Sequence, residues 1–275
     1  MERPWEIVGK RVLTIPDWHQ DLAWVKAILD RERGSYDHIV FLGDEFDSHR
    51  PDSEIVSVTE AALFVKELID GKHGPVTLLL GNHTLAYMEA FYKASRHQTP
   101  QLRNICSGYS NSAAKKIAKV FMWADWRRFE LFKLVNGRLL SHAGFLGDFW
   151  DRNESVEDNL HALYRESQEA LENVAFKGSR FFRCGLYRGG NAFHGGPCWL
   201  DFDAEFVDEL PLPQVVGHTN RKEDPVRQRG TSYCIDGGQS TYALIQPDGS
   251  IEFKSIVQTP ISKTWVEEPV TITQL

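Results

Sequence analysis

The sequence predicts an α/β fold, because short apolar runs alternate with amphipathic helical segments in its N-terminal part. The apolar runs at 11–16, 38–42 and 76–80 each stop at a polar cluster before a helical pattern begins. Strands that alternate with helices form a mainly parallel sheet, and ligand sites lie beyond the carboxyl ends of its strands. We therefore expect the chemistry of this protein to lie at those strand ends.

Helices are predicted between the first and second strands and between the second and third. Asp21 is a candidate N-cap for the first helix, which is predicted to end near Gly34 because glycine commonly follows helices. The second helix covers about 53–70, where apolar residues fall on one helical face. Each helix therefore forms a crossover between parallel strands.

The middle of the chain is predicted to be a helical insertion in a single domain that covers residues 1–275. Residues from about 85 to 128 have a helical pattern, a polar interruption and no strand pattern. Beyond them, Asn136-Gly137 separates apolar runs at 129–135 and 138–140, and this dipeptide is a strong signal for a β-hairpin. The hairpin marks the return from helices to strands.

The C-terminal half is predicted to contain one more helix and then mainly strands. Alternating apolar and polar residues near its end are typical of antiparallel strands. We expect these strands to form a meander in a second sheet. In order, the predicted elements are a helix at 156–176, an irregular Gly- and Arg-rich loop at 177–203, a strand at 213–216, and meander strands at 232–235, 242–246 and 251–257.

Composition limits the functional classes. The net charge of −7, from 31 basic and 38 acidic residues, argues against a nucleic-acid partner, which would require an exposed basic face. The four cysteines have no Cys-x-x-Cys spacing and are interpreted as reduced, buried thiols of a cytoplasmic protein. No signal peptide and no apolar run of ~18 residues is found, so no membrane partner is expected.

Side chains of the kinds that bind metals follow five of the predicted strands. Each cluster alone is weak evidence for a metal site, because a histidine after a strand is more often structural and Gly-Asp is commonly a turn. An apolar run precedes every cluster, however, so all of them could meet at one edge of the fold. The clusters are Asp17 and His19, Asp44 and Asp47, Asn82 and His83, His142, and His218.

The order of these motifs resembles that of the calcineurin-like metallophosphoesterase superfamily. The motifs are Asp-x-His, Gly-Asp-x-x-Asp, Gly-Asn-His, His-x-Gly and Gly-His-Thr, and they span about Val12 to Gly237. They are most similar to the phosphoprotein-phosphatase-type branch, including its bacterial and phage members. The resemblance implies a two-sheet β-sandwich core flanked by helices, with a dinuclear metal centre at one end.

The resemblance also implies a ligand set for two divalent metal ions. Mixed imidazole and carboxylate ligands suit Mn, Fe, Zn or Ni better than Mg or Ca, and Mn is the first expectation. Asp44 would bridge the two ions. The first metal would take Asp17, His19 and Asp44, and the second would take Asp44, Asn82, His142 and His218.

A catalytic role for two further residues follows from the same resemblance. A hydroxide that bridges the metals would attack the phosphate, and His83 would protonate the leaving alkoxide while Asp47 orients its imidazole. The chain departs from the family pattern at Thr84, where an acidic residue is usual. It also lacks the Arg-Gly that usually follows Gly-Asp-x-x-Asp, so Arg50 and Arg188 are candidates to bind the phosphate, together with Asn220.

These features predict a metal-dependent phosphomonoesterase, with a serine/threonine protein phosphatase as the first expectation. The expected partner is thus a phosphorylated substrate, either a phosphoprotein or a nucleotide. A dinucleoside polyphosphate or nucleotide hydrolase is one alternative, and a phosphodiesterase or nuclease is another. A non-catalytic protein-binding scaffold is the alternative from a different class.

Overall fold

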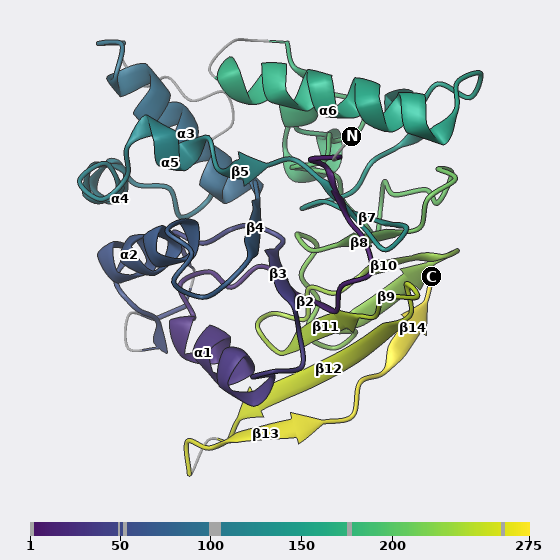
Figure 1. Cartoon of the computed structure of the whole chain (residues 1–275). Helices are drawn as coiled ribbons and strands as arrows, with labels where there is room; N and C mark the ends of the chain where they lie inside the picture. The colour runs from purple at the N-terminus through teal and green to yellow at the C-terminus, as the bar shows by residue number, and fades with distance from the viewer. Residues whose placement is uncertain (1–2, 49, 52–53, 99–105, 175–177, 260–261) are drawn as a thin grey trace.

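Two β-sheets form the centre of the protein in a computed structural model, which describes residues 3–48, 50–51, 54–98, 106–174, 178–259 and 262–275. Each sheet has seven strands, and each contains both parallel and antiparallel pairs. Figure 1 shows the sheets at the centre and lower right, with helices on the left and at the top. The predicted α/β class, with a two-sheet core flanked by helices, is therefore confirmed.

The first sheet contains the N-terminal parallel strands. β2, β3, β4 and β5 run parallel to one another. On the edge of β2 that faces away from β3, β11 pairs with β2 in the antiparallel direction. The strands, in spatial order, are β13 (Trp265–Glu268), β12 (Ile251–Gln258), β11 (Thr241–Ile245), β2 (Val12–Ile15), β3 (His38–Phe41), β4 (Val76–Leu79) and β5 (Phe129–Glu130).

The second sheet combines the predicted hairpin with C-terminal strands. β7 and β8 are parallel, β8 and β10 are parallel, and β6 and β7 form the antiparallel hairpin across Asn136-Gly137. The strands, in spatial order, are β1 (Glu6–Ile7), β6 (Lys133–Val135), β7 (Arg138–Leu140), β8 (Gln214–Val216), β10 (Ser232–Cys234), β9 (Val226–Arg229) and β14 (Ile272–Gln274).

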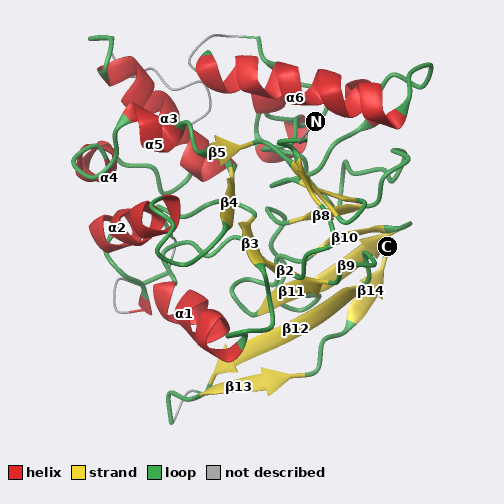
Figure 2. Cartoon of the chain, in the orientation of Figure 1, coloured by secondary structure: helices red, strands yellow, loops and turns green. Residues whose placement is uncertain are grey.

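In Figure 2 the helices, in red, lie to the left of the first sheet and across the top of the molecule. None of the helices in the described ranges is long and apolar enough to cross a bilayer. The helices are α1 (Leu22–Arg31), α2 (Val58–Ile69), α3 (Asn82–Ala94), α4 (Asn111–Ile117), α5 (Trp123–Trp126) and α6 (Val156–Glu172), with short 3-10 turns η2 (Gly147–Phe149), η3 (Arg180–Phe182) and η4 (Leu186–Arg188).

Alternate residues of β2, β3 and β4 face two different cores. Val12, Val40 and Leu79 join a buried cluster with Leu140 and Val215 of the second sheet, so these side chains fill the space between the sheets. Their sequence neighbours point to the opposite face and pack with buried residues of α1, α2 and α3. Because strand side chains alternate between faces, a four-residue strand buried on both sides reads as a continuous apolar run.

Capping sets the starts of the two crossover helices. Asp21 caps α1 as predicted, because its carboxylate accepts a hydrogen bond from the amide of Trp24 at 3.0 Å. The second helix begins at Val58 and not near 53, because Ser57 and Glu60 form a capping box at that point. Residues 52–53, where we predicted its start, lie outside the described residues, as do 175–177 at the predicted end of the 156–176 helix.

Two predictions about the sheets were wrong. The apolar run at 129–135 does not form one strand: β5 belongs to the first sheet and β6 to the second, so the chain changes sheets within the run. The predicted C-terminal meander does not form a sheet of its own. β11 and β12 extend the first sheet through pairing with β2, whereas β10 lies in the second sheet. Periodicity identifies strands but does not determine which distant strand becomes the partner.

We predict that Phe46 anchors the segment between the first sheet and the helices. Its ring is 1% exposed and makes edge contacts with Tyr87, Phe121 and Trp126 at centroid distances of 5.6–6.1 Å. Phe46→Ala should lower the free energy of unfolding by ~3–5 kcal/mol, measured by urea denaturation. As a control, Phe193→Ala should change it by less than ~0.5 kcal/mol, because Phe193 is 87% exposed. Equal losses in both variants would contradict this assignment.

Candidate metal centre

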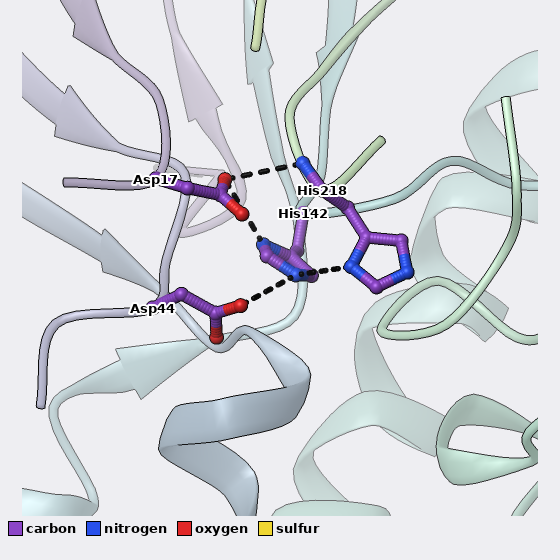
Figure 3. A group of neighbouring side chains, drawn as sticks. All are labelled: Asp17, Asp44, His142 and His218. Carbon is purple, nitrogen blue, oxygen red and sulfur yellow. Dashed lines mark hydrogen bonds and ion pairs between the residues drawn. The ribbon is translucent and has the colours of Figure 1, made fainter. Parts of the chain in front are cut away.

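Strand ends from both sheets converge on one buried group of side chains. Asp17 and Asp44 follow β2 and β3 of the first sheet, and His142 and His218 follow β7 and β8 of the second. One possible ligand atom from each lies within 4.8 Å of the others, and all four side chains are buried. Figure 3 shows the four side chains directed toward one another. These residues could hold a metal ion. The site therefore lies where the carboxyl ends of strands from both sheets meet.

The backbone at these strand ends adopts an uncommon conformation. Asp44, His218 and His19 have φ values of 56°, 67° and 40°. These values lie in the left-handed region, which residues other than glycine rarely adopt. The chain also approaches itself closely: a Cβ added to Gly81 would collide with Asp44 Oδ1. Glycine is thus required beside Asp44, and strained backbone of this kind is concentrated at functional sites.

The carboxylate of Asp44 caps helix α3 with one oxygen and faces the site with the other. Oδ1 accepts hydrogen bonds from the main-chain amides of His83 and Thr84, at 2.9 and 3.3 Å, in the first turn of α3. Oδ2 lies 3.3 Å from His142 Nε2. The cap sets the orientation of the carboxylate, so the free oxygen is aimed at the centre.

Asp17 divides its oxygens in the same way. Oδ1 accepts a hydrogen bond from the main-chain amide of His218 at 3.1 Å, and this bond links the first sheet to the second. Oδ2 faces His19 Nε2 at 3.9 Å. Each aspartate therefore uses one oxygen to hold the fold together and leaves the other available to a cation.

The atom His142 Nε2 lies at the centre of a set of ligand atoms. It is 3.0 Å from Asn82 Oδ1, 3.1 Å from His218 Nδ1 and 3.3 Å from Asp44 Oδ2. The other ring nitrogen of His142 donates a hydrogen bond to the carbonyl of Leu42 at 2.9 Å, as metal-binding histidines commonly do. Adjacent ligands of a metal with bonds of ~2.1 Å lie about 3 Å apart, so this donor set fits a transition-metal ion.

A second group lies beside the first. His19 Nδ1 donates a hydrogen bond to the main-chain carbonyl of Asp47 at 2.8 Å, which leaves Nε2 facing Asp17. His83 Nδ1 lies 2.8 Å from Asp47 Oδ1, and the rings of His19 and His83 meet edge to face with centroids 5.1 Å apart. Asp47 thus contacts both imidazoles, and the predicted Asp47–His83 pair is within hydrogen-bonding distance.

The buried carboxylates control the charge of the imidazoles. Burial opposes protonation of His142, but the charges of Asp44 and Asp17 raise its pKa to about 9. Burial also opposes protonation of His19, yet its hydrogen bond to Asp47 and the charge of Asp44 raise its pKa to about 10. For His218, burial and the positive charge of His142 lower the pKa. The buried aspartates therefore favour the imidazolium form of His142 and His19, whereas His218 favours the neutral form.

A carboxyl group that the sequence analysis did not consider lies directly behind Asp44. Glu45 is fully buried, its carboxylate accepts a short hydrogen bond from the hydroxyl of Thr84, and its amide donates to the same hydroxyl at 3.3 Å. Burial raises the pKa of Glu45 to about 8. Family members usually have an acidic residue at the position of Thr84. In this chain Glu45, which follows β3, places a carboxyl group beside Thr84 instead. The signal for it in the sequence was an acidic residue next to Asp44, directly after the apolar run at 38–42.

The candidate phosphate-binding residues are in different environments. Arg188 donates to the hydroxyl of Thr219 at 2.9 Å, beside His218, and pairs with Asp201 at 2.9 Å. Its charge contributes to the lowered pKa of His218, after burial and His142. Arg188 therefore lies next to His218 of the candidate metal centre.

Arg50 and Asn220 are held by carboxylates. The guanidinium of Arg50 forms an ion pair with Asp21, the N-cap of α1, and another with Glu54 at 3.2 Å. The amide of Asn220 donates to Asp236 at 3.2 Å. Both of the Arg50 partners are acidic, so its charge is already neutralised within the protein.

Comparisons with known proteins agree with this architecture. The family model described as calcineurin-like phosphoesterase matches residues 10–220. The structure of a cold-active protein-tyrosine phosphatase of a psychrophilic Shewanella species is similar, with a TM-score of 0.58 and 17% identity over 96% of this chain and 82% of that one. A protein serine/threonine phosphatase of Saccharomyces cerevisiae is also similar, with a TM-score of 0.50 and 16% identity over 94% of this chain and 84% of that one.

No curated protein matches the sequence. At these identities, the two phosphatase structures show a shared fold. The family match covers most of the chain, from before β2 to just after His218, and it includes every strand end described above. The chain belongs to the calcineurin-like phosphoesterase family.

Proposed function

We propose that this protein is a phosphomonoesterase that uses two divalent metal ions. The observation that carries the proposal is the set of nitrogen and oxygen atoms around His142 Nε2, at 3.0–3.3 Å, between two buried carboxylates. The family membership supports a phosphoesterase. The first ion would be bound by Asp17, His19 and Asp44, and the second by Asp44, Asn82, His142 and His218.

Imidazole, amide and carboxylate ligands favour Mn, with Fe, Zn and Ni as alternatives. Bound divalent cations supply Lewis acidity, which polarises phosphate oxygens and activates water for attack on phosphorus. The protein contributes the fixed orientation of the ligands. Hydrogen bonds from His142 and His19 to main-chain carbonyls leave Nε2 of each ring directed at the site.

We assign His83 as the general acid that protonates the leaving alkoxide. Burial opposes its protonation, but the charge of Asp44 and the hydrogen bond and charge of Asp47 raise its pKa, which favours the protonated ring that an acid requires. Its side chain is 14% exposed, which allows contact with a substrate, and Asp47 Oδ1 at 2.8 Å orients the ring. A proton donor next to the ligands, and not among them, is what the departing alcohol requires.

For the phosphate itself, we favour Arg188 over Arg50. Arg188 lies against Thr219, which follows His218, and its second partner is a single carboxylate, Asp201. Arg50 is bound by two carboxylates. A guanidinium that binds a phosphate should keep its positive charge uncompensated, and Arg188 is paired with one carboxylate where Arg50 is paired with two. Asn220 remains a candidate for a smaller contribution beside the first ion.

We propose a phosphorylated protein side chain as the substrate, with a nucleotide or dinucleoside polyphosphate as the alternative. The Shewanella and yeast proteins that share the fold are named as protein phosphatases, and this supports the choice. We also propose that the chain is a single domain, that the helices from about 85 to 128 form an insertion, and that the protein acts in the cytoplasm.

A pair of chromogenic substrates tests the proposed reaction. With added Mn²⁺, the protein should hydrolyse p-nitrophenyl phosphate and leave bis(p-nitrophenyl) phosphate largely intact, and excess chelator should abolish the activity. Preference for the diester would instead indicate a phosphodiesterase or nuclease. Binding of two metal ions without hydrolysis of either ester would indicate a non-catalytic scaffold.

Replacement of His83 separates the acid from the ligands. His83→Ala should retain both metal ions, measured by elemental analysis, and lose ~10²–10⁴ in kcat on a phosphate ester of an aliphatic alcohol. The loss should be much smaller for p-nitrophenyl phosphate, whose leaving group needs little protonation. His161→Ala, on the exposed face of α6, serves as the matched control. Loss of a metal ion from His83→Ala would show that His83 is a ligand.

Metal binding should release protons. His142 and His19, with pKa values raised to about 9 and about 10, are protonated at pH 7.5 and must become neutral to bind a cation. Titration calorimetry with Mn²⁺ in buffers of different ionisation enthalpy should show release of roughly two protons. Affinity should rise with pH until these groups have titrated. His19→Ala should release about one proton fewer, and zero release by the unmodified protein would refute the assignment.

A further inference from the structure

A buried thiol contacts the amide of a proposed ligand. Cys106 and Asn82 are each 3% exposed. The Sγ atom of Cys106 donates a hydrogen bond to the main-chain carbonyl of Asn82 at 3.1 Å, and the Asn82 side-chain Nδ2 donates to the same sulfur at 3.4 Å. The thiol therefore contacts both the main chain and the side chain of Asn82, at the first residue of helix α3.

The direction of these bonds determines which end of the amide faces the centre. A thiol has a single hydrogen, and Cys106 donates it to the carbonyl of Asn82, so toward the side chain the sulfur can only accept. An acceptor selects the NH₂ end of the amide. The oxygen is then left on the opposite side, where it lies 3.0 Å from His142 Nε2.

We propose that Cys106 is a positioning residue that holds the Asn82 amide with its oxygen toward the second metal ion. A rotation of the amide by half a turn would present hydrogens to a cation, which cannot be bound, and would place the oxygen against the sulfur lone pairs. The inference rests on the proposed function, in which Asn82 is a metal ligand. Residues that orient a ligand in this way affect metal affinity without contact with the metal.

The other thiols provide a comparison. Cys198 is also fully buried, and it donates to the main-chain carbonyl of Leu80 at 3.3 Å. In the part of the chain that the structure describes, no hydrogen bond links Cys198 to a side chain of the proposed ligand set. Removal of the Cys198 sulfur therefore leaves a similar cavity but does not free a ligand.

Metal affinity is the measurement that tests this role. Cys106→Ala should bind one Mn²⁺ with unchanged affinity and the other about 10- to 100-fold more weakly, measured by calorimetry or chelator competition. Cys106→Ser, which keeps one donor and one acceptor, should stay within about threefold of the unmodified protein. Cys106→Val fills the cavity without either group and should behave as Cys106→Ala does, so a packing defect is tested separately. Cys198→Ala should bind both ions normally.

A double variant distinguishes orientation from general structural support. Asn82→Asp presents an oxygen in either rotation, so in that background Cys106→Ala should cause little further loss of affinity. A loss that persists in full with Asn82→Asp would overturn the proposal, as would normal binding of both ions by Cys106→Ala and Cys106→Val. If the unmodified protein binds no metal, the proposed function itself fails. Wild-type binding with an unaffected Cys106→Ala refutes only the role of Cys106.

Discussion

Two carboxylates buried between β-sheets impose the constraint on which the rest of this structure depends. Asp17 and Asp44 are each 1% exposed, and isolated charges in such surroundings are highly unfavourable. The protein compensates with main-chain amides from His218, His83 and Thr84 and with protonated imidazoles. Divalent cations at the proposed site would perform the same compensation more strongly.

The same hydrogen bonds hold the fold and prepare the site. Asp44 caps α3, so the carboxylate that would bridge two ions also begins the helix that carries Asn82 and His83. Asp17 binds the amide of His218, so a residue of the first sheet fixes the strand end of the second. Asp44 and His218 both have left-handed backbone conformations, which are held in place only where surrounding contacts of this kind support them. Fold and site therefore form as one unit.

Departures from the family motifs are explained by contacts between different strand ends. Thr84 stands where an acidic residue is usual, and the buried carboxyl group of Glu45 lies against its hydroxyl. Arg50 follows the Gly-Asp-x-x-Asp motif but is bound by the cap of α1, whereas Arg188 from a distant loop lies beside Thr219. Specificity for the alcohol part of a substrate would then depend on the helices after α3 and on the loop that carries Arg188.

By itself, the sequence determined the α/β class, the parallel order of β2, β3 and β4, the cap at Asp21 and the hairpin at Asn136-Gly137. These features depend on short-range periodicity and on conformational preferences, which a few neighbouring residues express. The ordered motifs also identified which residues to examine at the strand ends.

Only the tertiary structure decided that β5 and β6 lie in different sheets, that β11 pairs with β2, and that Arg50 is neutralised by neighbouring carboxylates. It also revealed the contact between Cys106 and Asn82. Pairings of this kind depend on packing between residues far apart in the chain, and no local pattern encodes them.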